Sequence, residues 1–190
     1  VDQANVWEDD PAAREKNYQN ALAHLKAAPI LGARFVRIDA GCRRDNWTNQ
    51  EFDHIVKRYK EYARFAQDHG FKVGAENHWG AEKFWPNLKK LYEAVGHPAF
   101  GLSIHIGGWG GSEEEKARAD REAAPWTCHT HIAWNITEGP LEEKLKTLWD
   151  AGYQGYYSIE HHTAKNEYSE VAVQLAKVRN VLDRLKSPAS

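Results

Sequence analysis

The sequence predicts an α/β fold: most of a (β/α)8 barrel, forming a single domain over residues 1–190. Short runs of β-branched and aromatic residues alternate with amphipathic helical patterns, which is typical of a parallel sheet built from βα units. Polar side chains also gather at the ends of successive predicted strands, as they do on the catalytic face of a barrel. A doubly wound sheet would fit the same alternation. However, the segment after the first strand, GCRRDN, is not the glycine-rich phosphate loop that such a sheet normally carries.

Five segments are predicted to be strands, and amphipathic patterns predict helices between them. The strands are expected at 32–41, 71–78, 101–108, 128–134 and 155–162, and the helices at 10–28, 52–66, 88–95, 141–148 and 167–186; the charged stretch 112–122 is expected to be a solvated helix or a lid. Pro29 is expected to end the first helix. Val1 to Val6 are expected to form the tail of a sixth strand. The buried stripe of the last helix is expected to include Leu175.

Composition excludes two classes of partner. The formal net charge is −2, with 25 basic and 27 acidic residues, so no basic surface predicts nucleic-acid binding. No apolar run approaches the roughly 18 residues of a membrane helix, and no signal peptide is visible. Cys42 and Cys128 lie far apart and have no zinc-site spacing; two unpaired thiols favour a reducing compartment, so we expect a cytoplasmic protein.

Four predicted strands end with a residue that can bind a metal: Glu76, His105, His131 and Glu160. Residues two apart on a strand share a face, so one inward residue from each of four neighbouring strands converges on the barrel axis. A single Glu or His at a strand end is more often a surface or hydrogen-bonded structural residue. Because four such residues occupy equivalent places in consecutive βα units, the pattern predicts a site for one divalent metal.

Other polar and aromatic residues near these strand ends are expected to contact a sugar. Arg37 and Asp39 share the inward face of their strand, and three tryptophans follow strand ends, where a ring can stack on a sugar or simply fill the barrel mouth. The nearby histidines are expected to lie around the ligands rather than among them. The predicted substrate contacts are Arg37, Asp39, His78, Trp79, Trp109, Trp134 and His161.

Several motifs are similar to the successive strand motifs of the xylose isomerase-like TIM barrel superfamily. They are LGARFVRIDAG, FAQDHGFKVGAENH, VGHPAFGLSIHIGGW, HTHIAWN and AGYQGYYSIEHH, and the resemblance runs from about Val1 to Leu185. It implies a TIM barrel of this type that lacks the first one or two βα units. The chain starts at Val1 and contains no Met, as a processed, trimmed or incomplete product would. Because the first βα units are also missing, we expect the sequence to begin partway through a longer chain. An open sheet edge implies either completion by that N-terminal segment or a homo-oligomer.

The resemblance also implies a ligand set and a reaction. Epimerase-type members hold their metal with a Glu, an Asp, a His and a Glu, and Glu76, His131 and Glu160 match three of these. His105 stands at the Asp position, which favours Mn, Co, Zn or Fe over Mg. It should also make metal affinity fall as the pH drops through the range near the histidine pKa of about 6.5. Glu76 and Glu160 are implied as the catalytic pair that moves a proton between the two faces of the substrate.

The implied activity is that of a divalent-metal-dependent sugar or sugar phosphate isomerase or epimerase, acting through a metal-stabilised enediolate. One alternative is a metal phosphodiesterase related to endonuclease IV, although the acidic charge balance and the unmatched extra ligands count against it. A second alternative is a barrel remnant that binds sugar without turnover. The sequence does not identify the sugar, its phosphorylation or the native metal.

Overall fold

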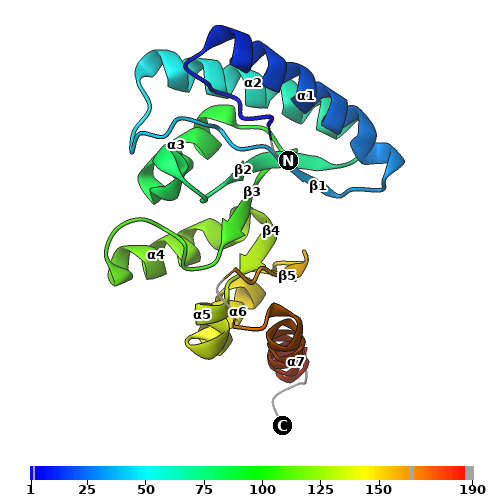
Figure 1. Ribbon diagram of the computed structural model, residues 1–190, viewed down its shortest axis with the longest axis vertical. Coiled ribbons are helices and arrows are strands. Elements are labelled where there is room, and N and C mark those ends of the chain that lie inside the picture. Colours follow the sequence, from blue (N-terminus) through cyan, green and yellow to red (C-terminus); the bar gives the residue numbers. More distant parts are fainter. Residues whose placement is uncertain (2, 163–164, 187–190) are drawn as a thin grey trace.

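Five short strands form one parallel sheet in the order β1-β2-β3-β4-β5, curled into half of a barrel (Figure 1). This computed structural model describes residues 1, 3–162 and 165–186. The strands are β1 (Phe35–Arg37), β2 (Lys72–Glu76), β3 (Phe100–His105), β4 (Thr127–Ile132) and β5 (Tyr157–Ile159). All five lie within or overlap the predicted segments. The fold is a TIM barrel of the predicted type that is truncated, with one side open.

The register of the sheet brings the carboxyl ends of the strands together. Glu76 pairs with Ser103, and His105 pairs with His131. A register shift at Leu102 and Ser103 separates the regular parts of the β3–β4 ladder. Parallel strands in register end at the same edge of a sheet, so polar residues at these ends share one rim of the half barrel.

The N-terminal segment continues the sheet beyond β1 by a single bridge. The backbone N–H of Val6 donates to Asp39 O at 2.9 Å, that of Trp7 donates to Ala40 O at 2.8 Å, and Trp7 bridges Gly41 in parallel. The expected strand tail is therefore present as irregular pairing rather than as a strand. Residue 2 of that segment lies outside the described residues.

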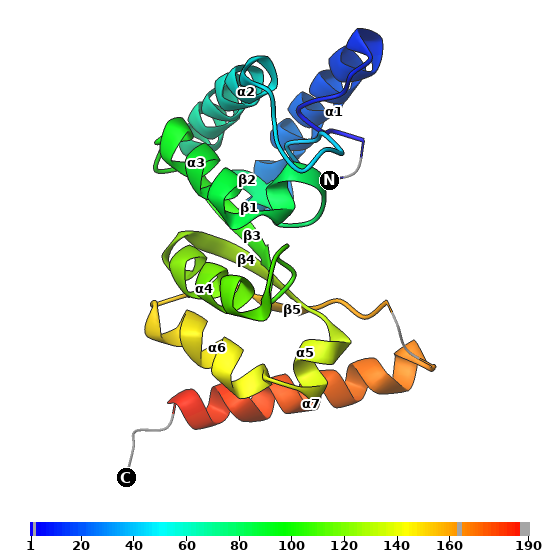
Figure 2. The same ribbon diagram turned by 90° about the vertical axis from the view of Figure 1, so that its left-hand side faces the viewer.

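Helices cover the convex side of the sheet (Figures 1 and 2). They are α1 (Pro11–Ile30), α2 (Asn49–Asp68), α3 (Trp85–Val95), α4 (Glu113–Ala123), α5 (Trp134–Glu138), α6 (Leu141–Asp150) and α7 (Glu167–Lys186), with short 3₁₀ turns η1 (Gly80–Lys83) and η2 (Ala124–Trp126). Side chains cap α1, α2, α4 and α7: Asp10, Thr48, Ser112 and Asn166 accept hydrogen bonds from first-turn backbone amides, and Thr48 and Ser112 form capping boxes.

Two details of the helix prediction are wrong. Helix α1 passes through Pro29 and ends at Ile30, because a proline in the last turn removes only one hydrogen bond and Leu31 N–H still donates to Ala27 O at 3.0 Å. In α7, Leu175 is 38% exposed and Gln174 is buried instead. The Gln174 amide donates to Ile132 O at 2.8 Å and to Thr137 Oγ1 at 2.7 Å, so a polar side chain ties this helix to β4 and α5.

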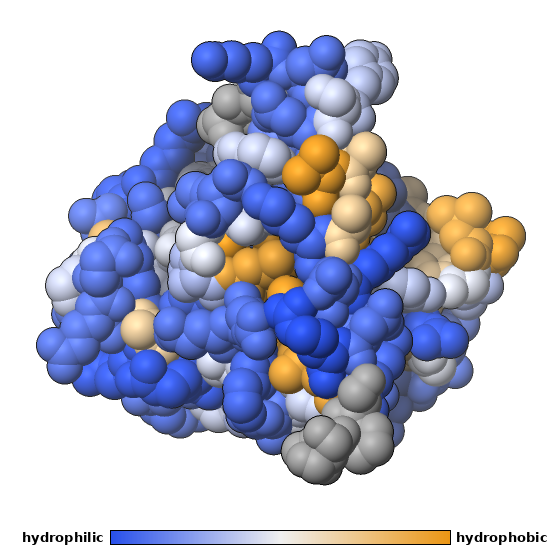
Figure 3. All heavy atoms as spheres, turned by 90° about the horizontal axis from the view of Figure 1, so that it is seen from below, coloured by the Kyte–Doolittle hydropathy of each residue, from blue (hydrophilic) through white to orange (hydrophobic). Residues whose placement is uncertain are grey.

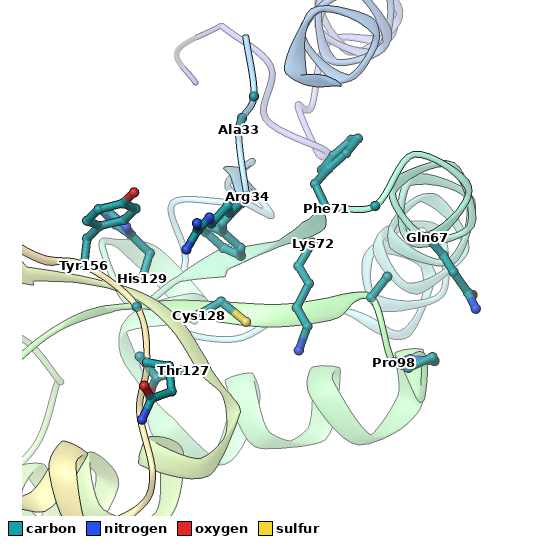
Figure 4. Close-up of a pocket in the computed structure, with 16 residues that line it drawn as sticks. Ala33, Arg34, Gln67, Phe71, Lys72, Pro98, Thr127, Cys128, His129 and Tyr156 are labelled. Atoms are coloured by element: carbon teal, nitrogen blue, oxygen red, sulfur yellow. The ribbon is translucent and has the colours of Figure 1, made fainter. Parts of the chain in front are cut away.

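Figure 4 shows side chains around the amino ends of the strands. A cavity of about 950 Å³ lies there, with Phe35, Lys72, Cys128, His129 and Tyr156 among its lining residues. Apolar patches also interrupt the largely hydrophilic face seen from below (Figure 3). None of the described helices is long and apolar enough to cross a membrane.

Candidate metal and catalytic site

Four polar side chains converge at the carboxyl ends of β2 to β5. Glu76 and His105 are the last residues of β2 and β3, His131 lies near the end of β4, and Glu160 follows β5, where its N–H donates to Ile132 O at 3.0 Å. Ligand atoms of Glu76, His105 and His131 all lie within 4.8 Å of one another. Glu160 Oε2 contacts His105 Nε2 and lies 3.5 Å from His131 Nδ1. The structure therefore brings all four predicted ligands together.

Glu76 is the fully buried centre of this group. Its Oε1 accepts from Ser103 Oγ at 3.1 Å and lies 2.5 Å from His131 Nδ1, while its Oε2 accepts from the Arg37 guanidinium at 2.6 Å. Burial opposes ionisation, but His131, Arg37 and His105 outweigh it and lower the pKa of Glu76 to about 2. Glu76 is therefore an anion at neutral pH. Its Oε1 faces Ser103 and His131, and its Oε2 faces Arg37.

His105 is held through its backbone. The Asn77 side chain accepts from His105 N–H at 2.6 Å and donates to His105 O at 2.9 Å, which fixes the last residue of β3 beside the end of β2. Burial lowers the pKa of the His105 imidazole below its usual value, against the opposing effect of Glu76 and Glu160. A neutral imidazole keeps a lone pair for a metal, so this environment suits a ligand.

Glu160 lies in a wetter setting than Glu76, with 27% of its side chain exposed. Burial acts to raise its pKa, but His162, 3.0 Å from Oε1, together with His105 and His131 lowers it. Both carboxylates approach the same nitrogen of His131, Glu76 at 2.5 Å and Glu160 at 3.5 Å. The site thus contains two ionised carboxylates around one imidazole, one buried and one accessible.

These residues fit a divalent metal ion. His131 Nδ1 and Glu160 Oε2 are buried and have no hydrogen bond among the described residues, although they lie 3.5 Å apart and His131 Nδ1 also faces Glu76. Buried polar atoms of this kind are normally satisfied. Two carboxylates and two imidazoles are ligands of Mn, Fe, Co and Zn, and they are close enough for small side-chain movements to place them about 2 Å from one ion.

Three of the predicted substrate contacts lie beside this group. Arg37 Nε is 3.5 Å from Asp39 Oδ1, and His78 Nδ1 is 3.8 Å from both Asp39 Oδ2 and Glu76 Oε2. The His78 ring is stacked on the His105 ring, with centroids 5.8 Å apart and planes 7° apart. Asp39, followed by Glu76, raises the pKa of His78, which burial opposes.

The three tryptophans that were predicted to contact substrate have fewer contacts with the ligand group. Trp79 directly follows His78 and is half-buried, and half-buried Trp134 stacks on His161 with centroids 4.7 Å apart. Trp109 is 1% exposed and donates from Nε1 to Asp120 Oδ1 at 2.8 Å. The structure does not bring Trp109 to the metal ligands, because its indole nitrogen and ring are used in packing under α4.

His161 also turns away from the cluster. Its side chain is 1% exposed, and its Nε2 lies 3.0 Å from Glu170 Oε2 on α7. The alternation of side chains along an extended chain explains this, since His161 is adjacent to Glu160 and points to the opposite face. The assignment of Trp109 and His161 as substrate contacts is therefore not supported by their positions.

Two further residues shape the site without having been predicted to do so. Asn77 clamps the backbone of His105, and buried Asp120 accepts from Gly107 N–H at 3.1 Å and from Trp109 Nε1 through Oδ1, while its Oδ2 forms an ion pair with Lys144 Nζ at 2.8 Å. Asp120 thereby fixes the loop after β3. For Asn77 the available signal was its place directly after the strand that ends in Glu76. For Asp120, in the middle of a charged helix, the sequence offers no such signal.

Comparisons with known proteins agree with this architecture. A family model described as xylose isomerase-like TIM barrel matches residues 2–185. A xylose isomerase-like TIM barrel protein from Mycobacterium smegmatis, solved in complex with magnesium, is similar over 97% of this chain and 72% of its own, with a TM-score of 0.77 and 15% identity.

Two other solved structures are named as epimerases or as epimerase-like. The 3-keto-D-glucoside 4-epimerase YcjR from E. coli is similar over 94% of this chain and 76% of its own, with a TM-score of 0.75 and 15% identity. A D-tagatose 3-epimerase-like protein is similar over 97% of this chain and 77% of its own, with a TM-score of 0.75 and 18% identity. A search of curated proteins found no match. At these identities the structural likeness establishes the fold.

Proposed function

Since this chain belongs to the xylose isomerase-like TIM barrel family, we propose that it is a divalent-metal-dependent isomerase or epimerase of a sugar or sugar phosphate. The observation that carries the proposal is the pair of ionised carboxylates, Glu76 and Glu160, that approach one nitrogen of His131 from different strands. Two carboxylates beside a metal are sufficient for removing and returning a proton next to a carbonyl.

Glu76, His105, His131 and Glu160 would hold the ion. When bound, a divalent metal would polarise the substrate's carbonyl and adjacent hydroxyl and stabilise the negative charge of an enediolate. Mn, Co, Zn or Fe would be favoured over Mg, because two imidazole ligands make the site softer than carboxylates alone. That a similar structure contains magnesium makes Mg²⁺ the natural comparison in any binding assay.

The two carboxylates would take different shares of the proton transfer. Glu160 is partly exposed and sits on the open rim, so it can exchange a proton with substrate and solvent. Glu76 is fully buried and has a pKa of about 2, so its carboxylate stays ionised at neutral pH. Arg37 and His131 stabilise this anion and oppose its protonation. Glu160 is thus the more readily protonated member of the pair.

Substrate contacts are proposed for the residues on the same rim. Arg37 and Asp39 lie beside Glu76, and His78, with 46% of its side chain exposed, offers a ring nitrogen to a hydroxyl. Trp79 and Trp134 would supply ring faces for the apolar side of a sugar. Trp109 and His161 are left out of this proposal because both are buried away from the ligands.

Solvent deuterium exchange tests the proposed reaction. The protein is loaded with Mn²⁺, incubated with a panel of ketoses and ketose phosphates in D₂O, and followed by NMR. Deuterium entering the carbon next to the carbonyl of at least one substrate, and its absence with Glu160→Gln, is the expected result. Binding of Mn²⁺ with no exchange on any sugar would instead support the non-catalytic barrel. Cleavage of a phosphodiester without exchange would support the hydrolytic alternative.

A further inference from the structure

Two groups of potential metal ligands share Glu76. The first contains Glu76, His105 and His131, and the second contains Asp39, Glu76 and His78, with ligand atoms within 4.8 Å of one another in each group. The groups use different oxygens of the shared carboxylate. Oε1 faces His131 at 2.5 Å, whereas Oε2 lies 3.8 Å from His78 Nδ1. The geometry is that of two adjacent cation positions joined by one carboxylate.

The second position already has a positive charge. Glu76 is fully buried and Asp39 is 5% exposed, and two buried carboxylates so close together require a cation. The Arg37 guanidinium provides it, with NH1 2.6 Å from Glu76 Oε2 and Nε 3.5 Å from Asp39 Oδ1. Asp39 Oδ1 is nevertheless a buried atom that has no hydrogen bond among the described residues. This buried oxygen without a hydrogen-bond donor is a second observation, besides the grouping of Asp39, Glu76 and His78, that points to a position able to bind a cation.

We propose that the Arg37 guanidinium fills a second cation position, and that removing it converts Asp39, Glu76 Oε2 and His78 into a second divalent-metal site. This inference rests on the proposed metal site at His105 and His131. Two carboxylates and one imidazole suit Mn²⁺ or Zn²⁺, and a bridging carboxylate holds two such ions about 3.5–4 Å apart. A guanidinium does not lose its proton in proteins, so in the native chain this position is closed to metal at every accessible pH.

The substitution of an arginine for a second ion also bears on the type of chemistry. Two-metal sites act as a clamp on the attacking and leaving oxygens of a phosphodiester. With Arg37 in place the native chain offers a single metal position, which can stabilise an oxyanion during proton transfer. The second position of a two-metal clamp would open only when Arg37 is removed.

Metal stoichiometry tests the proposal directly. Each protein is dialysed to equilibrium with Mn²⁺, the bound metal is counted by elemental analysis, and EPR reports whether neighbouring ions are coupled. The native chain should bind one Mn²⁺ with an uncoupled spectrum, and Arg37→Met should bind two with a coupled spectrum. Arg37→Lys, which keeps a positive charge, should bind one, as should Arg37→Met combined with Asp39→Asn, which removes a ligand of the second position.

Two Mn²⁺ in the native chain, or no more ions in a folded Arg37→Met protein than in the native chain, would overturn the inference. Arg37→Gln gives a second route to the same answer if the Met variant does not fold, because it removes the positive charge but keeps a polar side chain; it too should bind two ions. Failure of the underlying metal site gives a different pattern: no ion in the native chain and one in Arg37→Met that survives His131→Ala. That outcome would leave the Arg37 position intact and remove the proposed function.

Discussion

Replacing Glu76 by Gln should destabilise the metal-free protein several times more than replacing Glu160 by Gln. Both changes remove one negative charge and keep the shape of the side chain. Glu76, however, is fully buried and compensates the Arg37 guanidinium, whose side chain is 20% exposed. Glu160 keeps 27% of its side chain exposed and contacts imidazoles rather than a guanidinium.

The magnitudes follow from this difference in burial. Removing one partner of a buried ion pair costs about 3–5 kcal/mol, and the lower end, about 3 kcal/mol, applies here because Arg37 is partly exposed and retains Asp39. The partly exposed contacts of Glu160 are worth about 1 kcal/mol or less. For a chain of this size each kcal/mol shifts the melting temperature by about 2–4 °C. We therefore expect the melting temperature to fall by about 6–12 °C in Glu76→Gln and by at most about 2–4 °C in Glu160→Gln.

Thermal unfolding followed by circular dichroism, at pH 7 with EDTA present, measures both variants against the native chain. The pH dependence supplies an internal control. The pKa of Glu76 is lowered from 4.5 to about 2, so its stabilisation is complete above pH 4.5 and is lost as the pH falls towards 2. The gap between native and Glu76→Gln melting temperatures should therefore narrow over that range. Equal losses for the two variants at pH 7 would refute the reasoning from burial.

Four further predictions concern activity, metal binding and assembly. Glu160→Gln should lower turnover by about 10²–10⁴-fold in steady-state kinetics at saturating Mn²⁺, the usual effect of losing an acid–base group; near-native turnover would rule out its role. Mn²⁺ affinity, measured by calorimetry, should decline only below about pH 6.5, because burial lowers the pKa of His105 and protonation removes its lone pair. His105→Asp should move the preference from Mn²⁺ towards Mg²⁺; equal preference in both proteins would show that His105 is not a ligand. The 190-residue chain should self-associate in analytical ultracentrifugation, because the sheet has open edges and Tyr168, Val173 and Tyr156 are exposed; a monodisperse monomer would contradict this.

The sequence predicted the part of the molecule that depends on periodicity. Alternating strands and amphipathic helices gave the parallel order, and the position of Glu76, His105, His131 and Glu160 at strand ends gave their convergence, because parallel strands in register end at one rim. These features need only backbone geometry, which local residue patterns specify. The structure brings the four predicted ligands together for that reason.

What the sequence did not predict depends on side-chain partners. Trp109 follows a strand end like Trp79, yet its ring is buried against Trp85 and its indole N–H donates to Asp120 on α4. Gln174 takes a core position that hydrophobic spacing assigns to Leu175, because two buried acceptors lie opposite it. Arg37 was expected to meet substrate, and its contact with Glu76 depends on the pairing of β1 with β2.

The central claim is that one divalent ion lies between Glu76, His105, His131 and Glu160. Anomalous diffraction from crystals grown with Mn²⁺ tests it most directly, since it locates the ion independently of turnover. The account predicts one strong anomalous peak per chain, about 2 Å from Glu76 Oε1, a ring nitrogen of His131 and a Glu160 oxygen. A peak away from these atoms, or none at saturating Mn²⁺, would contradict it.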